Sequence, residues 1–194
     1  MKLKKIKLVI FHPYSSIGGA DKSIARLING LNDRKYEIIF ITLNKAYIKN
    51  YLTKKIKIIE IKSSKTIFSI FKIRRTLNKI LKTERAIFFS NQNFANIISF
   101  FILYKINNIK QVIVERNHID ELNFNKGIYD GLKKKLIKNL MILLYRKADG
   151  IIGNAKKLST DLASLTGSKV KTIYNPAFDK DIFKNKNKKI KLYR

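Results

Sequence analysis

Apolar, β-branched runs alternate with helix-like segments along this chain, and this alternation constrains the fold more than any other feature of the sequence. The runs predict seven strands: Ile6–Phe11, Tyr36–Thr42, Ile56–Ile61, Ala86–Phe89, Gln111–Glu115, Gly150–Ile152 and Val170–Ile173. The segments between them predict five helices: Ala20–Leu31, Ile67–Leu81, Phe94–Ile106, Tyr129–Arg146 and Ala155–Leu165. Strands that alternate with helices indicate an α/β fold with a parallel, doubly wound sheet. Because the strands are continuously apolar, we expect the sheet to be buried on both faces.

The length of 194 residues is enough for one domain with a sizeable core. We expect a single three-layer domain with a mostly parallel sheet over residues 1–178. From Asp179 to Arg194 the apolar pattern fades and lysines accumulate, so residues 179–194 are predicted to form a basic tail or a truncated interdomain linker. No window is long enough for a membrane span, and the first apolar run is too short for a secretory signal.

A formal net charge of +29 accompanies a complete absence of cysteine. Disulfides, thiolate metal sites and cysteine nucleophiles are therefore excluded, which fits a reducing cytoplasm. Only His12 and His118 could supply an imidazole, so we expect no metal site. The charge favours phosphates, anionic membranes or nucleic acid as partners, although an A/T-rich genome would produce a similar lysine-rich composition. Nucleic acid is the weaker candidate, because arginine is scarce and the lysines are spread along the whole chain.

In doubly wound sheets, ligands bind at the carboxyl ends of the strands, near the point where the strand order reverses. The candidate site segments are therefore those that follow the predicted strands: Pro13 to Gly19, Ser90 to Asn93, Arg116 to Asp120, Gly153 to Asn154, and Asn175 to Asp179.

A glycine pair, Gly18-Gly19, lies between the first predicted strand and the first predicted helix. Glycine tolerates positive φ angles and lets a ligand approach the backbone closely. The helix that follows offers unpaired N–H groups and a partial positive charge, which favour an anion such as a phosphate. A tight βα turn without a ligand explains the pair at least as well, because short glycine motifs are weak signals. The G-x-G-x-x-G spacing of dinucleotide sites and the P-loop lysine pattern are both absent.

The densest polar cluster follows the fifth predicted strand and begins Glu115-Arg116-Asn117-His118. An acid, a guanidinium, an amide and an imidazole in adjacent positions could bind a hydroxyl-rich or phosphorylated ligand. His118 titrates near neutrality and is the candidate general base, with an ordinary loop histidine as the alternative. No G-x-S-x-G elbow supports a Ser-His-Asp site.

The fourth predicted strand is followed by the amides of Asn91, Gln92 and Asn93. Amide groups at a strand end could bind sugar hydroxyls. An asparagine here could instead cap the helix that is predicted from Phe94, because asparagine is a favoured N-cap residue.

The segment from Ile128 to Arg146 is predicted to be an amphipathic helix. Its apolar residues recur at helical spacing: Ile128, Leu132, Leu136, Leu140 and Leu143, widened by Ile137, Met141 and Leu144. On the other side we expect a basic face of Lys133, Lys134, Lys135 and Lys138. Such a helix could lie on an anionic membrane surface. The alternative is an ordinary core helix with a solvated face.

Three segments, in order along nearly the whole chain, resemble the N-terminal half of family 4 glycosyltransferases. Gly18-Gly19-Ala20-Asp21 looks like the family's G-G-A-E loop, with aspartate in place of glutamate. The segment from Ala148 to Lys157 is similar to A-D-x-I-I-x-x-S-x-x, with Asn154 where serine is usual. Val170 to Pro176 resembles V-x-V-I-x-N-P/G, and Glu115-Arg116-Asn117 looks like the E-R-N run of members that extend lipid-linked saccharides.

The resemblance implies a Rossmann-like domain that forms one half of a GT-B fold. In such enzymes the Gly18-Gly19 loop would approach the diphosphate of a nucleotide-sugar donor, and no metal would be bound. Four residues would face a saccharide or lipid-linked acceptor: Asn91, Arg116, Asn117 and His118. The basic helix would suit a peripheral enzyme at the inner face of the membrane, in cell-envelope polysaccharide biosynthesis.

In this family the second domain holds most of the nucleotide-sugar site, including an E-x7-E motif, and the 194 residues do not include it. We therefore expect an acceptor-binding half that is inactive alone and binds no cofactor itself. A separate protein that supplies the second domain is a possible partner. The alternatives are a basic module that binds anionic membrane or nucleic acid, and a fragment without independent function.

Overall fold

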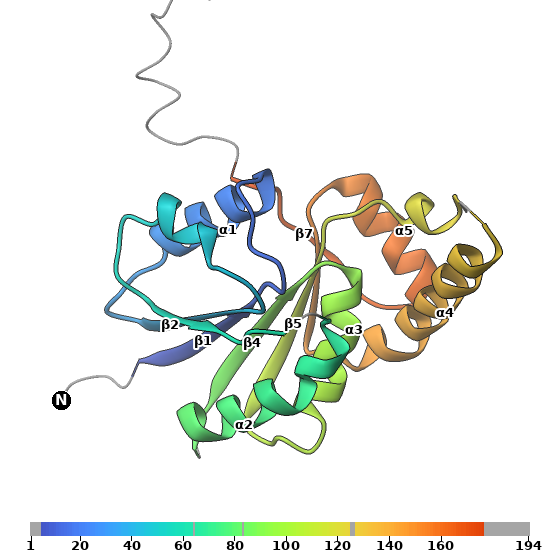
Figure 1. Cartoon of the computed structure of the whole chain (residues 1–194). Coiled ribbons are helices and arrows are strands. Elements are labelled where there is room, and N and C mark those ends of the chain that lie inside the picture. Colours follow the sequence, from blue (N-terminus) through green and yellow to red (C-terminus); the bar gives the residue numbers. More distant parts are fainter. Residues whose placement is uncertain (1–4, 64, 83, 125–126, 177–194) are drawn as a thin grey trace, which may run out of the picture.

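Seven parallel strands form one sheet in the order β3-β2-β1-β4-β5-β6-β7 (Figure 1). The computed structural model describes residues 5–63, 65–82, 84–124 and 127–176. The strands are β1 (Ile6–Phe11), β2 (Tyr36–Thr42), β3 (Lys57–Glu60), β4 (Ala86–Asn91), β5 (Ile109–Glu115), β6 (Gly150–Gly153) and β7 (Lys171–Thr172). The helices are α1 (Gly19–Gly30), α2 (Ile70–Leu81), α3 (Asn93–Leu103), α4 (Ile128–Leu144) and α5 (Lys156–Thr166).

The predicted α/β fold is confirmed, and every strand pair is parallel. The predicted bounds of β1 and β2 agree with the structure, and the other elements differ at their ends by a few residues. Short 3-10 helices at Tyr47–Tyr51 and Ile119–Leu122 were not predicted, because they carry no periodic apolar pattern. The tail that we predicted for residues 179–194 lies outside the described residues.

Helices cover the two faces of the sheet unequally. On one face, α2 and α3 pack Ile73 and Ile98 against Phe88, and α4 and α5 pack on Ile113 and Ile151. On the other face, α1 and the Tyr47–Tyr51 turn cover β1 and β2. Figure 1 shows α1 and α2 on opposite sides of the sheet. The fold therefore has three layers, in which one outer layer is much smaller than the other.

Burial of the sheet on both faces was predicted, and for β4, β5 and β6 the prediction is confirmed only in part. On the face away from α2, α3, α4 and α5, Asn91 and Val114 are buried. Four other residues on that face are half-buried: Ile87, Phe89, Val112 and Ile152. Continuous apolar sequence indicated two covered faces, but the core that α1 forms over β1 and β2 reaches only Ile87 and Phe89 of these strands.

The apolar side that was predicted for α4 is only partly buried. Ile137 and Met141 are the buried residues of this helix. Four residues of that apolar side are more than half exposed: Ile128, Leu132, Leu136 and Leu143. The 3.6-residue period groups these apolar residues correctly, but it does not show which part of a wide apolar surface meets the sheet. No helix in the described part of the chain is long and apolar enough to cross a membrane.

Candidate functional site

The strand order reverses between β1 and β4. From β1 the chain moves outward through β2 and β3, and from β4 it moves the other way through β5, β6 and β7. Phe11 pairs with Ser90, so the next residues, His12 and Asn91, stand side by side where these strands end. Ligands of doubly wound sheets bind in the crevice at such a reversal.

The loop after β1 is held in place by Asp21, the third residue of α1. Its buried carboxylate accepts hydrogen bonds from the Ser16 N–H at 2.7 Å and from the Ser15 hydroxyl at 2.5 Å. His12 Nε2 lies 3.7 Å from Asp21 Oδ2. Burial acts to raise the pKa of Asp21, but His12 and the two serines together hold it below its usual value. A charged aspartate therefore fixes the loop that presents the glycine pair.

Gly18 and Gly19 form the open first turn of α1. Gly18 is the N-cap residue with an extended backbone (φ −125°), so positive φ is not the reason for glycine here. A Cβ atom added to Gly19 would meet nothing within 4 Å, which leaves room for a ligand to approach the backbone. Within residues 5–63, 65–82, 84–124 and 127–176, no hydrogen bond engages the N–H groups of Gly18 or Gly19. This geometry suits an anion at the start of a helix.

Arg116 links three elements at the carboxyl edge of the sheet. Its Nε donates to Asn91 Oδ1 at 3.2 Å, and its Nη1 donates to Asn175 Oδ1 at 3.1 Å. Asn175 Oδ1 also accepts a hydrogen bond from the hydroxyl of Ser23 on α1, at 3.2 Å. We call these four residues the Arg116 clasp. Burial lowers the pKa of Arg116 from its usual value.

Two polar atoms at the strand reversal are buried and have no hydrogen-bond partner among the described residues. They are Asn91 Nδ2 and His12 Nδ1, whereas His12 Nε2 faces the Asp21 carboxylate at 3.7 Å. Buried polar groups in folded proteins are nearly always satisfied, so unpaired ones at the reversal point indicate a place where a ligand or water bonds. Sequence reasoning missed His12 and Ser23 as site residues. The position of His12 directly after a strand was the available signal.

In the described part of the chain, no hydrogen bond joins His118 or Asn117 to the clasp. His118 Nδ1 lies 2.9 Å from Asp120, and its Nε2 lies 3.5 Å from Asp161 on α5. Lys157 completes this cluster, because its ammonium bonds Asp161 at 2.8 Å. Asn117 is exposed. Of the four predicted acceptor-binding residues, the hydrogen bonds join only Asn91 and Arg116.

Glu115 was part of the polar cluster that could bind a ligand, but its side chain is buried in the fold. Its carboxylate is buried on the opposite face of the sheet and accepts the Tyr145 hydroxyl at 2.9 Å. It also accepts the backbone N–H of Arg116 at 3.1 Å, so it positions the turn that carries the clasp. Burial raises the pKa of Glu115 to about 7, against the effect of these hydrogen bonds.

The alternative role of this segment as a helix cap is confirmed in part. The N-cap residue of α3, Gln92, makes no side-chain cap hydrogen bond, but the side chain of Asn93 accepts the backbone N–H of Phe94 in the first turn at 2.6 Å. No group of three or more histidine, aspartate or glutamate side chains in the described part of the chain could hold a metal ion.

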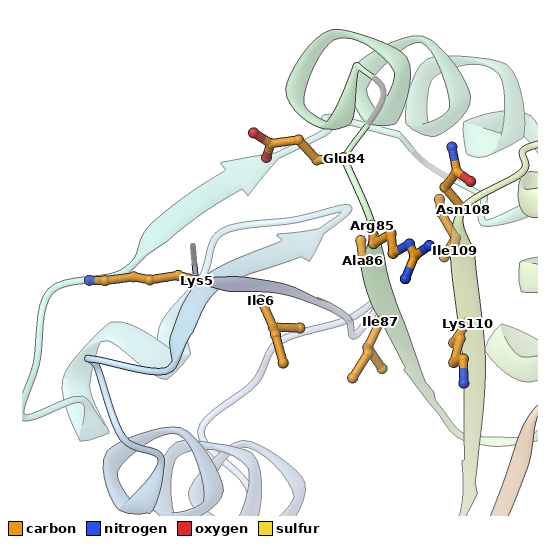
Figure 2. Close-up of a pocket in the computed structure, with 9 residues that line it drawn as sticks. All are labelled: Lys5, Ile6, Glu84, Arg85, Ala86, Ile87, Asn108, Ile109 and Lys110. Atoms are coloured by element: carbon orange, nitrogen blue, oxygen red, sulfur yellow. The ribbon is translucent and has the colours of Figure 1, made fainter. Parts of the chain in front are cut away.

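Two cavities of similar size lie at different edges of the sheet. One of about 650 Å³ is at the carboxyl edge, beside the glycine loop, and Ile17, Asn44, Lys45 and Lys62 are among its lining residues. The other, of about 800 Å³, lies at the amino ends of β1, β4 and β5, away from the clasp (Figure 2). Ligands of doubly wound sheets bind at the carboxyl ends of the strands, and the unpaired buried atoms of Asn91 and His12 lie at these ends too. The carboxyl edge is therefore the favoured functional edge of the sheet.

A family model, Glycosyltransferase Family 4, matches residues 17–177, which include the glycine loop, the clasp and the His118 cluster. The chain belongs to glycosyltransferase family 4. A comparison with curated proteins found no match.

Solved glycosyltransferase structures share the fold of this family 4 domain. Anabaena HepE in complex with UDP and glucose has a TM-score of 0.64 and 14% identity, over 90% of this chain and 45% of that chain. A glycosyltransferase from Rickettsia africae has a TM-score of 0.60 and 15% identity, over 89% of this chain and 43% of that chain. A UGT transferase from Siraitia grosvenorii in complex with UDP has a TM-score of 0.58 and 10% identity, over 88% of this chain and 50% of that chain. These are GT-B structures, and the family 4 domain spans about half of their length.

Proposed function

We propose that this chain is the acceptor-binding half of a glycosyltransferase, which transfers a sugar from a nucleotide sugar to a saccharide or lipid-linked acceptor. The observation that carries the proposal is the Arg116 clasp beside the unpaired atoms of His12 and Asn91 at the strand reversal. Guanidinium and amide groups suit hydroxyls and phosphates, because they offer several donors in a fixed geometry.

The glycine loop and the His118 cluster have separate roles in the proposal. The free N–H groups of Gly18 and Gly19 would approach the donor diphosphate. His118 is the candidate base, and Asp120 and Asp161 on either side would orient its ring. The nucleotide sugar would be held mainly by polypeptide outside these 194 residues, because the family 4 domain spans about half of the similar chains.

A purified chain of these 194 residues is expected to show no turnover of UDP-glucose, because in this proposal the donor is held mainly by polypeptide outside them. Release of UDP would be followed by a coupled assay, with added UDP as the positive control for detection. UDP released at a rate proportional to the amount of chain would contradict the proposed division between two halves.

An Arg116→Gln variant is expected to bind saccharides at least about tenfold more weakly, because a hydrogen bond from a charged group contributes about 1.5–3 kcal/mol. Binding to an array of neutral and phosphorylated glycans would be measured for both proteins. Arg146→Gln is the matched control, because Arg146 is exposed and, among the described residues, its side chain bonds only the carbonyl of Ile142 near the end of α4. Equal losses in both variants would show a general effect of positive charge instead of a site at Arg116.

We also propose that α4 contacts an anionic membrane, which would bring the site close to a lipid-linked acceptor at the inner face. The support is a stripe of exposed apolar residues on α4: Ile128, Tyr129, Leu132, Leu136 and Leu143. Lys133 and Lys135 are exposed beside it, whereas Lys134 and Lys138 bond Asp130 and Asn123. Helices with apolar and lysine-rich surfaces bind anionic lipid in this way. The same proposal includes a role for this chain in the synthesis of cell-envelope polysaccharides.

Leu136→Ala is expected to weaken binding to phosphatidylglycerol vesicles about fivefold, because less apolar surface enters the lipid. Lys133→Gln should weaken it by a similar factor, since one lysine near such a surface contributes about 1 kcal/mol. Sedimentation with the vesicles measures both effects, and Lys171→Gln on β7 is the control for loss of charge elsewhere. Undiminished binding of Leu136→Ala would show that α4 does not enter the membrane.

A further inference from the structure

A chain of buried polar side chains lies behind the Arg116 clasp, on the sheet face that α3 and α4 cover. Glu115, Tyr145, Asn96 and Ser90 are at most 1% exposed. Glu115 Oε2 accepts the Tyr145 hydroxyl at 2.9 Å and the Asn96 amide at 3.5 Å. Asn96 Oδ1 in turn accepts the Ser90 hydroxyl at 2.7 Å. We call these four residues the Glu115 network.

The Glu115 network and the Arg116 clasp hold the same two strand ends from opposite faces of the sheet. Ser90 and Asn91 are consecutive on β4, and their side chains leave the strand on opposite faces. In the same way, Glu115 ends β5 and Arg116 follows it. Glu115 Oε1 accepts the Arg116 N–H at 3.1 Å and the Asn117 N–H at 3.5 Å. The carboxylate therefore fixes the backbone from which the guanidinium extends.

Stability of the fold does not explain a carboxylate at position 115. In the described part of the chain no cation pairs with Glu115, and burial of an ionised group without a counter-charge is costly. Burial raises the pKa of Glu115 to about 7, so the ionised form that prevails above this pH destabilises the fold. A glutamine would make comparable contacts without a charge. Groups that reduce stability in this way are characteristic of functional sites.

We propose that Glu115 is a positioning residue, whose negative charge holds Arg116 in the orientation that binds the ligand. The inference rests on the proposed function, because it concerns the same site. A hydrogen bond to an ionised acceptor is roughly twice as strong as one to a neutral acceptor. The proton can be taken up only at the oxygen beside Tyr145, because a hydroxyl can accept the new O–H and an N–H group cannot. Protonation therefore weakens the bond to the Arg116 N–H without breaking it.

Neutral glycans are expected to bind the wild-type chain about three- to tenfold more tightly at about pH 8.5 than at about pH 5.5. In Glu115→Gln this difference should disappear, because no charge changes behind Arg116. Tyr145 is the one titratable side chain that bonds Glu115 among the described residues, and its raised pKa keeps it neutral over this range. His12 and His118 are present in both proteins, so the difference between the two pH profiles reports Glu115.

A second measurement follows Arg116 itself and needs no ligand. Its Nε–H donates to Asn91, so NMR should detect slowed exchange of this proton with water. The exposed Arg146 is the reference in the same spectrum, because its Nε–H bonds the carbonyl of Ile142. The protection of Arg116 relative to Arg146 should fall about three- to tenfold between about pH 8.5 and about pH 5.5 in the wild type, and should stay constant in Glu115→Gln.

Tyr145→Phe should move the midpoint of both changes to higher pH, because the hydroxyl that lowers the pKa of Glu115 is absent. Tyr36→Phe on β2 is its matched control and should leave the midpoint unchanged. The same pH dependence of Arg116 protection, or of measurable glycan binding, in wild type and Glu115→Gln would overturn the inference. Protection that depends on Glu115 in a chain that binds no glycan would instead refute the proposed function alone.

Discussion

Relative to a Glu115→Gln variant, the wild-type chain is expected to lose about 3 kcal/mol of unfolding free energy as the pH rises from about 4 to about 8. Burial raises the pKa of Glu115 from 4.5 to about 7 in the folded chain. Between these two values the folded state binds more protons than the unfolded state, so stability falls as the pH rises. The contribution is fully present below 4.5 and is lost as the pH passes through 7.

Glutamine is the right replacement because its amide oxygen still accepts the N–H of Arg116 and its amide nitrogen meets the Tyr145 hydroxyl. Chemical unfolding at several pH values would give the difference between the two proteins. The comparison with Glu115→Gln cancels the opposite contribution of Asp21, whose pKa is lowered. Tyr145→Phe should move the pH range over which stability is lost to higher pH, because the tyrosine hydroxyl lowers the pKa of Glu115. If the unfolding free energies of wild type and Glu115→Gln changed in parallel with pH, the raised pKa of Glu115 would be contradicted.

Gly153→Ala is expected to destabilise the chain by about 2–3 kcal/mol, because an added methyl group overfills a packed contact. A Cβ atom at Gly153 would lie 2.4 Å from Ser159 Oγ and 3.1 Å from the backbone of α5 at the same residue. Thermal unfolding should show a decrease of about 5–10 °C in Tm. Close packing of α5 on the end of β6, and not an unusual backbone angle, is thus the reason for glycine at this position.

Gly150→Ala on the same strand is the matched control for this substitution. Its Cβ atom would meet Val112 at 3.6 Å, which is ordinary contact, so we expect little loss of stability. Ser159→Ala combined with Gly153→Ala should recover part of the loss, because it removes the nearest atom. A double variant no more stable than Gly153→Ala alone would refute the contact with Ser159 Oγ as the cause.

The order and type of the main elements could be predicted from the sequence, because each strand is a short β-branched run bounded by polar or glycine residues. The strand ends also predicted which polar residues would gather at one edge of the sheet, and Asn91 and Arg116 do meet there. Their partners could not be predicted. Asn175 lies 59 residues after Arg116, and sequence spacing contains no signal for a contact across three strands.

The direction in which a side chain points was the second feature that could not be predicted from the sequence. Glu115 lies next to Arg116 in the sequence but faces the opposite side of the sheet, because successive strand residues alternate. The apolar residues of α4 are similar in character, and only packing shows that Ile137 is buried while Leu136 is exposed. In both cases the deciding interaction is tertiary and absent from local sequence.

The Arg116 clasp has a mechanical consequence. Arg26 Nη1 donates to the Pro176 carbonyl at 3.0 Å, one residue beyond Asn175, so the end of the described chain is tied to α1 as well as to Arg116. Tension on the chain at Pro176 is therefore expected to act on the hydrogen bonds of Arg26 and Arg116 as well as on β7. The point where the chain leaves the sheet and the guanidinium at the strand reversal are thus connected through two side chains.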